Sequence, residues 1–408
     1  MLTSRFRLTC LALLTALTSL VHAAAPLNER QDLFEAGKGG YALYHIPSLL
    51  VTTKGTILAW CEARNPGSDW SAIDFVMRRS ADDGKTWSEP KTFLKVDNPK
   101  PKNPMSLKLK STNPDHVTYN NCVLISARDG TVHAVFCLEY MRAFYARSTD
   151  DGVTWSKPVE ITKTFEEFSA KYPWKVLAAG PNHGVQMKSG RLVVPVWIST
   201  GTGGNAHRPS VTSTVYSDDA GKTWKAGEIA VPDTPEWINP NEAIGLELVD
   251  GRYMLNVRNE SKTHRRLVTY SKDGATGWST PQFDDALLEP ICMGSLIRLS
   301  AQPQSDKNRI LFSNPHNLDR EDGKGSPGAS RDRKNMTVKL SYDEGKTWAV
   351  SKVVEPGHGA YSDLAVTKAG TILLFFGNGG TPKFAGSKLS VVRFNLEWLT
   401  DGKDALKK

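Results

Sequence analysis

"SADDGKTW" occupies residues 80–87, and close copies of this octapeptide recur along the chain. They share the pattern Ser-x-Asp-x-Gly-x-Thr-Trp, and successive copies begin 68, 69, 54 and 70 residues apart. A repeat of this period is typical of repeat arrays and propellers, in which each copy belongs to one supersecondary unit. The copies lie at residues 80–87, 148–155, 217–224 and 341–348, with a degenerate copy at 271–278.

The residue types of the octapeptide indicate a structural turn. Asp and Ser side chains hydrogen-bond the backbone of tight turns, Gly supplies a positive φ, and Trp packs the turn onto the neighbouring sheet. Each copy follows a strand-like run, such as "DFVMRRS" (74–80) or "MTVKLS" (336–341). We interpret the repeat as a hairpin turn and not as a metal site, because no further ligands follow at loop spacing.

Between the copies, the chain consists of short β-type runs broken by Gly, Pro and Asn, for example "GTILAWCEA", "TVHAVFCLEY" and "GRLVVPVW". No helical periodicity of convincing length intervenes. At about 60 to 65 residues per four-stranded blade, the chain after residue 23 contains six blades. We therefore expect an all-β, six-bladed β-propeller that forms one domain over residues 24–408.

Residues 1–23 have the features of an export signal. Arg5 and Arg7 precede an apolar run at residues 11–20, and Val21-His22-Ala23 offers a small-residue cleavage site. The apolar run is too short for a comfortable transmembrane helix. The sequence therefore predicts a secreted or periplasmic protein that does not span a membrane.

Charge and composition exclude several classes of partner. The formal net charge of +8 falls to +6 without the two leader arginines, and the basic residues are dispersed, which argues against nucleic acid. A mean hydropathy of −0.37 excludes a polytopic membrane protein. No metal-binding cysteine spacing occurs, so we expect neither a metal nor a cofactor. We also expect the protein to be a monomer.

Two cysteines have a specific predicted relation. If Asp129-Gly130 is a two-residue hairpin turn, Cys122 and Cys137 face each other across it. The pattern is compatible with a cross-strand disulfide and equally with two buried thiols.

A further set of motifs appears in a fixed order around the repeats. They are "YHIPSLL" (44–50), "CEAR" (61–64) with Asp69, "GPNHGVQ" (180–186), "NEA" (241–243), "LNVR" (255–258), "RKNMTVKLS" (333–341), "YSDL" (361–364) and "RFNLEWL" (393–399). This ordered set resembles the exo-α-sialidases of the six-bladed propeller type, over nearly all of the chain after the leader. The resemblance implies a glycoside hydrolase whose substrate is a glycan with a terminal acidic sugar.

The resemblance also implies roles for individual residues. Tyr361 matches the nucleophile, Glu242 the carboxylate that takes its proton, and Asp69 the acid/base on a loop. A sialic acid carries a carboxylate on its anomeric carbon, so a neutral tyrosine is a better nucleophile there than a repelled carboxylate. Arg258 and Arg333 match two of three arginines that clamp the substrate carboxylate, for which planar guanidinium groups are suited.

Three neighbouring residues have less specific roles in this comparison. Arg64 either orients Asp69 or contacts the ligand. His183 is expected to be structural, and Asn241 to support Glu242.

The chain departs from the family pattern at two positions. His45 stands where the family has the first clamp arginine, and Phe376-Gly377 stand where a Tyr-Glu pair normally braces that arginine. A charge-assisted hydrogen bond contributes roughly 1.5 to 3 kcal/mol, so the loss could weaken carboxylate binding by on the order of tenfold to a hundredfold. Next to Arg258 and Arg333, protonation of His45 would be disfavoured.

Three interpretations therefore remain open. The first is an exported, retaining exo-α-sialidase-type hydrolase that acts through a tyrosyl intermediate on sialic acid or a related acidic sugar. The second is a glycosidase or lyase of changed specificity for another acidic sugar, in which His45 has a new role. The third is a propeller that binds glycans without catalysis.

Overall fold

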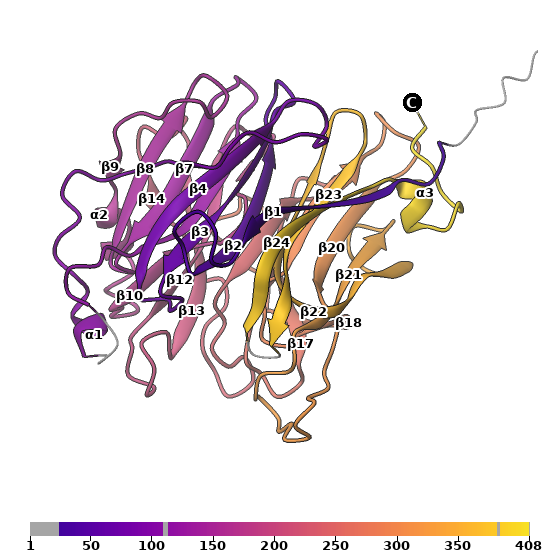
Figure 1. The fold of residues 1–408 in the computed structure, drawn as a ribbon. Coiled ribbons are helices and arrows are strands. Elements are labelled where there is room, and N and C mark those ends of the chain that lie inside the picture. Colours follow the sequence, from indigo (N-terminus) through magenta and orange to yellow (C-terminus); the bar gives the residue numbers. More distant parts are fainter. Residues whose placement is uncertain (1–23, 109–112, 382–383, 408) are drawn as a thin grey trace, which may run out of the picture.

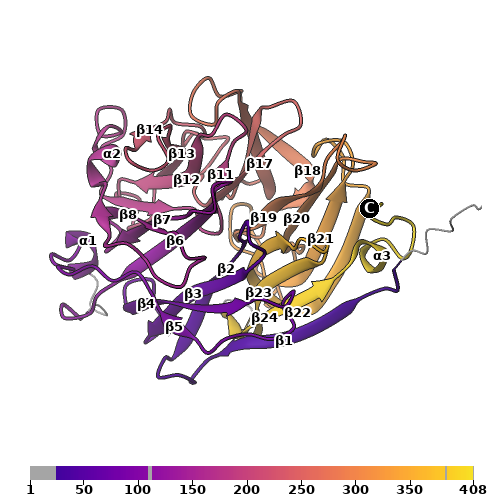
Figure 2. The same ribbon diagram turned by 90° about the horizontal axis from the view of Figure 1, so that it is seen from above.

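Six antiparallel blades follow one another in chain order around a central axis, as seen from the side in Figure 1 and from above in Figure 2. These coordinates are a computed structural model that describes residues 24–108, 113–381 and 384–407. The prediction of an all-β, six-bladed propeller is confirmed. The leader predicted at residues 1–23 lies outside the described residues and stays a prediction.

The first four blades are separate sheets. In the third blade, two short strands replace the innermost strand, because the segment 180–184 interrupts it. Blade 1 contains β2 (Leu43–Val51), β3 (Ile57–Asn65), β4 (Ala72–Ser80) and β5 (Lys91–Thr92); blade 2 contains β6 (Tyr119–Ser126), β7 (Val132–Leu138), β8 (Arg142–Ser148) and β9 (Val159–Glu160). Blade 3 contains β10 (Val176–Ala179), β11 (Val185–Gln186), β12 (Leu192–Ser199), β13 (Ser210–Ser217) and β14 (Lys225–Ala226); blade 4 contains β15 (Ala243–Glu247), β16 (Tyr253–Val257), β17 (Arg265–Ser271) and β18 (Gln282–Leu288).

Blades 5 and 6 are joined by one long strand, β22 (Val350–Val366). Its first half pairs with β21 as the outer strand of blade 5, and its second half pairs with β23 as the inner strand of blade 6. The remaining strands are β19 (Ser295–Ser300), β20 (Arg309–Pro315) and β21 (Lys334–Ser341) in blade 5, and β23 (Ile372–Thr381), β24 (Phe384–Phe394) and β1 (Asn28–Glu35) in blade 6.

The N-terminal strand closes the ring. β1 pairs antiparallel with β24, so the last blade takes its outer strand from the start of the chain, as the neighbouring indigo and yellow ribbons show (Figure 2). The helices are short connections: α1 (Pro104–Leu107), α2 (Thr162–Glu166) and α3 (Leu396–Leu399).

Each repeat octapeptide forms the turn that its residue types predict. In the first copy, the Asp82 carboxylate accepts hydrogen bonds from Thr86 N (2.9 Å) and from Thr86 Oγ1 (2.6 Å). Ser80 Oγ accepts a bond from Gly84 N at 3.0 Å, and Gly84 has a φ of 78°. These bonds satisfy the turn internally, so the repeat is a structural element. Equivalent carboxylates are Asp150, Asp219, Asp273 and Asp343.

The tryptophans of the repeats pack between blades. Every interface between adjacent blades has a hydrophobic cluster, and each cluster contains one tryptophan that follows the third strand of a blade. The sixth blade has no octapeptide, and Trp398 of α3 takes the equivalent position. The interface tryptophans are Trp87, Trp155, Trp224, Trp278, Trp348 and Trp398.

A buried carboxylate joins the blades at the propeller axis. Asp363, on the inner part of β22, is fully buried. Its oxygens accept bonds from Leu49 N (2.8 Å) of blade 1 and Ser295 Oγ (2.7 Å) of blade 5. His183 Nδ1, from the segment that interrupts blade 3, lies 3.0 Å from Asp363 Oδ1. Asn182 next to it donates to the carbonyl oxygens of Gly294 (3.1 Å) and Ser362 (3.0 Å), so blades 1, 3, 5 and 6 meet here.

The predicted juxtaposition of Cys122 and Cys137 is wrong. The hairpin turn is centred on Asp129 alone, and a β-bulge between Asn120 and Val123 shifts the register further, so that Cys137 lies opposite Asn120. The two thiols consequently belong to hydrophobic clusters on opposite faces of the sheet. Both are free and buried, and burial raises the pKa of the Cys137 thiol to about 12.

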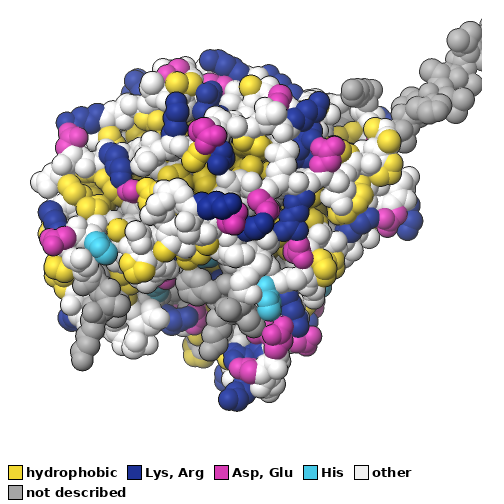
Figure 3. Space-filling model, in the orientation of Figure 1, with side chains coloured by type: hydrophobic (Ala, Val, Ile, Leu, Met, Phe, Trp, Pro, Cys, Tyr) yellow, Lys and Arg dark blue, Asp and Glu magenta, His cyan; other side chains and the backbone are white. Residues whose placement is uncertain are grey.

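Basic and acidic side chains are interspersed on the face drawn in Figure 3, without a continuous stripe of either sign. No helix within the described ranges has the length and apolar character needed to cross a bilayer.

We predict that His183 makes stability depend on pH. Burial opposes its charge, but the Asp363 carboxylate outweighs burial and raises the His183 pKa above its ordinary value of about 6.5. A group whose pKa is raised by folding stabilises fully below its unfolded pKa and loses this contribution as the pH rises through the folded value. The stability lost in His183→Gln, measured by urea denaturation, should be larger at pH 5.5 than at pH 9.

His133 is the matched control, because burial lowers its pKa to about 4. The stability difference between wild type and His133→Gln should therefore shift against the wild type as the pH falls below about 6.5. If both variants showed the same pH trend, the ion pair between His183 and Asp363 would not be the cause.

Candidate active site

One cavity at the centre of the propeller contains all of the residues that the sequence singled out for chemistry. Its volume is about 280 Å³, at the lower end for ligand pockets. Its lining comes from the inner strand ends and the connecting loops. The predicted residues in its wall are His45, Arg64, Asp69, Glu242, Arg258, Arg333 and Tyr361.

Tyr361, Glu242 and Arg258 form a hydrogen-bonded group in this cavity. Tyr361 Oη lies 2.6 and 2.7 Å from the two carboxylate oxygens of Glu242. Arg258 Nη1 donates to Tyr361 Oη at 2.6 Å and also forms an ion pair with Glu242. Tyr361 lies on β22, Glu242 directly before β15 and Arg258 directly after β16, so blades 4 and 6 build the group together.

Tyr361 holds its proton in the free protein. The side chain is 6% exposed, and this burial raises the pKa of the phenol well above its usual value. The nearby Arg258 guanidinium opposes the shift, and the Glu242 carboxylate adds to it. A neutral phenol beside a carboxylate is the arrangement of a nucleophile that is activated only when its proton can move to the neighbouring base.

Arg64 joins two carboxylates of blade 1. Its Nε and Nη2 donate to Glu62 Oε2 at 2.9 and 2.5 Å, and its Nη1 donates to Asp69 Oδ1 at 2.7 Å. Arg64 and Glu62 are buried, whereas half of the Asp69 side chain is exposed to the cavity and solvent. Of the two roles considered for Arg64, the ion pair favours orientation of Asp69, and Arg64 also lines the cavity.

The ion pair also affects the charge of Asp69. Although half of the Asp69 side chain is exposed, the protein that surrounds its carboxyl group in the cavity opposes ionisation. The Arg64 guanidinium outweighs this effect and holds the pKa of Asp69 below its usual range. Asp69 is therefore ionised in the free protein near neutral pH.

His45 lies against the Tyr361 ring, with the ring centroids 4.8 Å apart. Burial and the neighbouring Arg64 lower the pKa of its imidazole well below 6.5, so His45 is neutral at neutral pH. The first position of the arginine clamp thus contributes no positive charge.

The strand pattern also places residue 377 near this position. Along β23, Leu373 and Phe375 pack in the cluster between blades 6 and 1, whereas Phe376 packs in the cluster between blades 5 and 6. Because side chains alternate along a strand, a side chain at 377 would point towards blade 1, which carries His45.

Arg333 is the arginine of the cavity wall that has no carboxylate partner within 4.0 Å in the described chain. Its Nη2 donates to the carbonyl oxygen of Ile291 at 2.7 Å, and its guanidinium carbon lies 5.4 Å from the Tyr361 ring centroid. The other arginines of the wall are ion-paired: Arg64 with Glu62 and Asp69, Arg208 with Glu260, and Arg258 with Glu242.

Asn241, which is expected to support Glu242, and His183, which is expected to be structural, lie in different surroundings. Asn241 Oδ1 accepts a hydrogen bond from the backbone N–H of Glu242 at 2.8 Å, which holds the backbone of Glu242 in place. His183 is not part of the cavity wall and belongs to the network around Asp363.

The sequence analysis missed the opposite wall of the cavity. Tyr140, Trp197 and His207 pack there as a group, with ring centroids 5.0 to 6.3 Å apart, and Trp70 lies 4.8 Å from Tyr140. These residues come from blades 1 to 3 and carry no common motif. Glu62, by contrast, has a signal in the sequence: it is the one acidic residue in the apolar run "ILAWCEA", which indicates a buried carboxylate that needs a partner.

The cavity residues can be compared with known proteins. A family model described as "BNR repeat-like domain" matches residues 107–374, which is more than half of the chain. A sialidase of Micromonospora viridifaciens is 31% identical over 389 residues, which is 92% of this chain and 55% of that protein. A sialidase of Bacteroides fragilis (strain YCH46) is 30% identical over 360 residues, which is 84% of this chain and 61% of that protein. The chain belongs to the sialidase family with BNR repeats.

Solved structures of sialidases agree with the fold. The Hadza microbial sialidase Hz136 superposes with a TM-score of 0.70 at 23% identity, over 91% of this chain and 69% of that chain. The intramolecular trans-sialidase from Ruminococcus gnavus gives a TM-score of 0.69 at 19% identity, over 90% of this chain and 98% of that chain. This family member thus spans a little over half of the length of the curated relatives named above.

We predict that the fold depends on Glu62. Removing one partner of a buried ion pair leaves the other charge uncompensated, at a cost of about 3 to 5 kcal/mol. Glu62→Gln should therefore lower the free energy of unfolding by about 3 kcal/mol in urea titrations.

The control is Glu160→Gln, which removes the partly exposed partner of Arg142. It should change the free energy of unfolding by less than about 1 kcal/mol. Equal losses in the two variants would show that burial of Arg64 does not make its ion pair critical.

Proposed function

We propose that this chain is a retaining exo-glycosidase that releases a terminal sialic acid or a related acidic sugar from glycans. The observation that supports it most directly is the contact of Tyr361 Oη with the Glu242 carboxylate at 2.6 and 2.7 Å, inside a cavity that also holds Arg258 and Arg333. The named sialidases among its relatives support the same reaction class.

In the first step, Tyr361 Oη attacks the anomeric carbon while its proton passes to Glu242. The bond from the anomeric carbon to the leaving oxygen breaks, and Asp69 gives that oxygen its proton. In the second step, water attacks the same carbon and the bond from that carbon to Tyr361 Oη breaks. Asp69 takes a proton from the water, and Glu242 returns the proton to Tyr361. Two displacements at one carbon retain its configuration.

Asp69 has to carry a proton at the start, although Arg64 favours its ionised form. Substrate binding raises the pKa of Asp69, because the substrate carboxylate enters the cavity and a nearby negative charge raises the pKa of an acid. Closure of the cavity by the sugar also removes water from Asp69, which acts in the same direction.

The nucleophile fits a substrate that carries its own carboxylate. A carboxylate nucleophile would be repelled by that group, whereas a phenol approaches without charge. Arg333 is available to bind the anion because it has no carboxylate partner in the described residues. Arg258 contributes the second guanidinium once its bonds to Glu242 and Tyr361 rearrange.

We also propose that the protein acts after export, in the periplasm or outside the cell, as a monomer. The support for export is the leader pattern of residues 1–23. Glycans with terminal acidic sugars are the expected partners there.

Tyr361→Phe tests the reaction. The variant removes one oxygen atom, so hydrolysis of 4-methylumbelliferyl N-acetylneuraminic acid should fall by on the order of a hundredfold or more. Binding of 2,3-didehydro-2-deoxy-N-acetylneuraminic acid, measured by calorimetry, should remain within about threefold, because the arginines are unchanged.

Tyr253→Phe is the matched control. Tyr253 is fully buried in the cluster between blades 3 and 4, and its Oη has no hydrogen-bond partner among the described residues. This variant should keep wild-type hydrolysis. Unchanged turnover in Tyr361→Phe would contradict the proposed nucleophile.

The double variant His45→Arg with Gly377→Glu tests the two-arginine clamp. It restores a third guanidinium together with a brace from β23. A charge-assisted hydrogen bond contributes roughly 1.5 to 3 kcal/mol, so the dissociation constant of the didehydro sugar should fall by about tenfold to a hundredfold. An unchanged constant would contradict the proposed position of the carboxylate.

A second candidate is a glycosidase or lyase for another acidic sugar. It is favoured by the neutral imidazole of His45 at 4.8 Å from the Tyr361 ring, where the family has a cation. Turnover restricted to non-sialic acidic glycans and abolished in His45→Ala would select this candidate. Glycan binding without turnover on a broad panel would instead leave a binding protein.

A further inference from the structure

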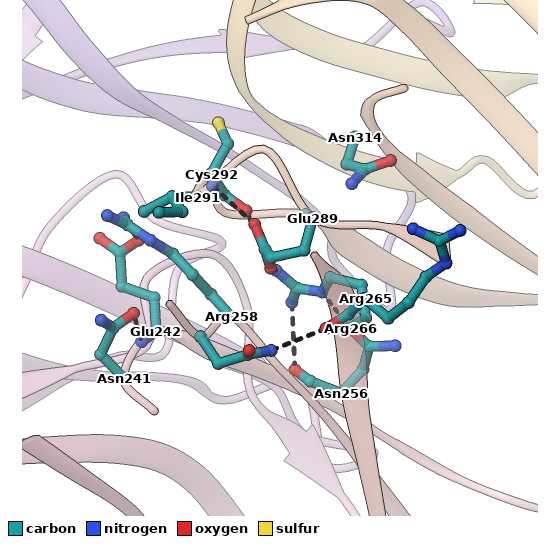
Figure 4. A network of polar contacts seen from close by, with 12 residues as sticks. Asn241, Glu242, Asn256, Arg258, Arg265, Arg266, Glu289, Ile291, Cys292 and Asn314 are labelled. Atoms are coloured by element: carbon teal, nitrogen blue, oxygen red, sulfur yellow. Dashed lines mark hydrogen bonds and ion pairs between the residues drawn. The ribbon is translucent and has the colours of Figure 1, made fainter. Parts of the chain in front are cut away.

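A buried ion pair that the proposed reaction does not use, Arg266 with Glu289, is drawn together with Arg258 in Figure 4. Arg266 Nη1 and Glu289 Oε2 are 2.7 Å apart, and both side chains are inaccessible to solvent. Buried ion pairs are costly, and replacement by apolar residues is often neutral or stabilising. The question is therefore what this pair does for the site.

The Glu289 carboxylate fixes one peptide plane. Its Oε1 accepts the backbone N–H of Cys292 at 2.8 Å. The other side of the same peptide unit is the carbonyl of Ile291, which accepts the Arg333 guanidinium at 2.7 Å. In a trans peptide the N–H and C=O point in opposite directions within a plane. When Glu289 holds the N–H, the Ile291 carbonyl consequently points towards Arg333.

The local backbone would not adopt this geometry without support. Ile291 has a φ of 65°, a region that β-branched residues rarely occupy. Arg331 N bonds the Pro290 carbonyl at 3.2 Å, and Arg266 Nη1 bonds the Cys292 carbonyl at 3.0 Å. The turn 289–292 is thus held on both sides of the residue that supports Arg333.

Arg266 also reaches the strand that carries the other clamp arginine. Its Nε donates to Asn256 Oδ1 at 2.7 Å and its Nη2 to the Asn256 carbonyl at 3.4 Å. Asn256 lies on β16, two residues before Arg258. One buried guanidinium therefore contacts both the support of Arg333 and the strand of Arg258.

We propose that Arg266 and Glu289 are positioning residues of the anion-binding site, which set the spacing of Arg258 and Arg333 for a substrate carboxylate. The proposal rests on the proposed function in so far as these two arginines bind that carboxylate. The spacing of Arg258 and Arg333 matters more in this protein than it would with three clamp arginines, because His45 adds no third guanidinium. Glu289 also places a negative charge near the guanidinium groups of Arg266 and Arg258, which would otherwise repel one another.

Arg266→Lys tests this role. Lysine keeps the charge opposite Glu289 but has a single nitrogen in place of the planar fork, which reaches Asn256 and Cys292 from two different nitrogens. We expect the KM for the fluorogenic sialoside and the dissociation constant of the didehydro sugar to rise about tenfold, with kcat within about threefold. Asn256→Ala, which leaves the ion pair intact, should raise both constants about threefold and provides a second variant if Arg266→Lys does not fold.

Arg309→Lys is the matched control. Arg309 is also a fully buried arginine and is paired with Asp404, but it contacts no residue of the cavity wall. It should lower the melting temperature as Arg266→Lys does and leave KM unchanged. Equal KM values in wild type and Arg266→Lys, or equal increases in both lysine variants, would overturn the proposal.

A crystal structure of Arg266→Lys gives a readout that does not depend on the reaction. The bond between Arg333 Nη2 and the Ile291 carbonyl should be broken or lengthened beyond 3.5 Å; an intact bond would overturn the proposal. If the wild-type chain bound no acidic sugar, the proposed function would fail, and this measurement would still decide whether the pair positions Arg333.

Discussion

The propeller and its candidate site both depend on the hydrogen bonds to one buried carboxylate, that of Asp363. It is fully buried and accepts hydrogen bonds from blades 1 and 5 while it contacts His183 of blade 3. Two residues earlier, the same strand presents Tyr361 to the cavity. The positions of the blades and of Tyr361, the proposed nucleophile, are therefore coupled through one short segment of β22, because an unpaired carboxylate at this depth would be strongly unfavourable.

The cavity is lined by several arginines, and the ion pairs among its residues decide which of them is available to an anion in the proposed function. Most of these guanidinium groups are neutralised by their own carboxylates. The pairs of Arg64 with Glu62 and of Arg258 with Glu242 are buried or nearly so, whereas the Arg208 side chain is 34% exposed. Arg333 is instead held by the Ile291 carbonyl, a partner without net charge. An incoming carboxylate can thus form an ion pair with Arg333 without displacing a protein carboxylate, so no existing ion pair has to be broken.

Local rules allowed parts of this arrangement to be predicted and not others. The turns at Asp82 and its equivalents were predictable, because Ser, Asp, Gly and Thr in fixed spacing satisfy their own hydrogen bonds. The contact between Tyr361 and Glu242 was predictable only by resemblance to a family, since the residues are far apart in the chain. The relation of Cys122 to Cys137 was mispredicted, because a β-bulge has no signal in this sequence and one extra residue reverses the face of every side chain beyond it.

By itself, the sequence determined the repeated turn, the number of blades and the residue types available for chemistry, because these depend on short-range hydrogen bonding and on the alternation of apolar residues. Only the tertiary structure decided which charges neutralise one another: that Arg64 is paired with Glu62 and Asp69, that His45 is neutral, and that Arg333 is supported by a carbonyl. The physical reason is that burial and the distance between charges are set by the packing of several blades around one axis, and no local segment contains that information.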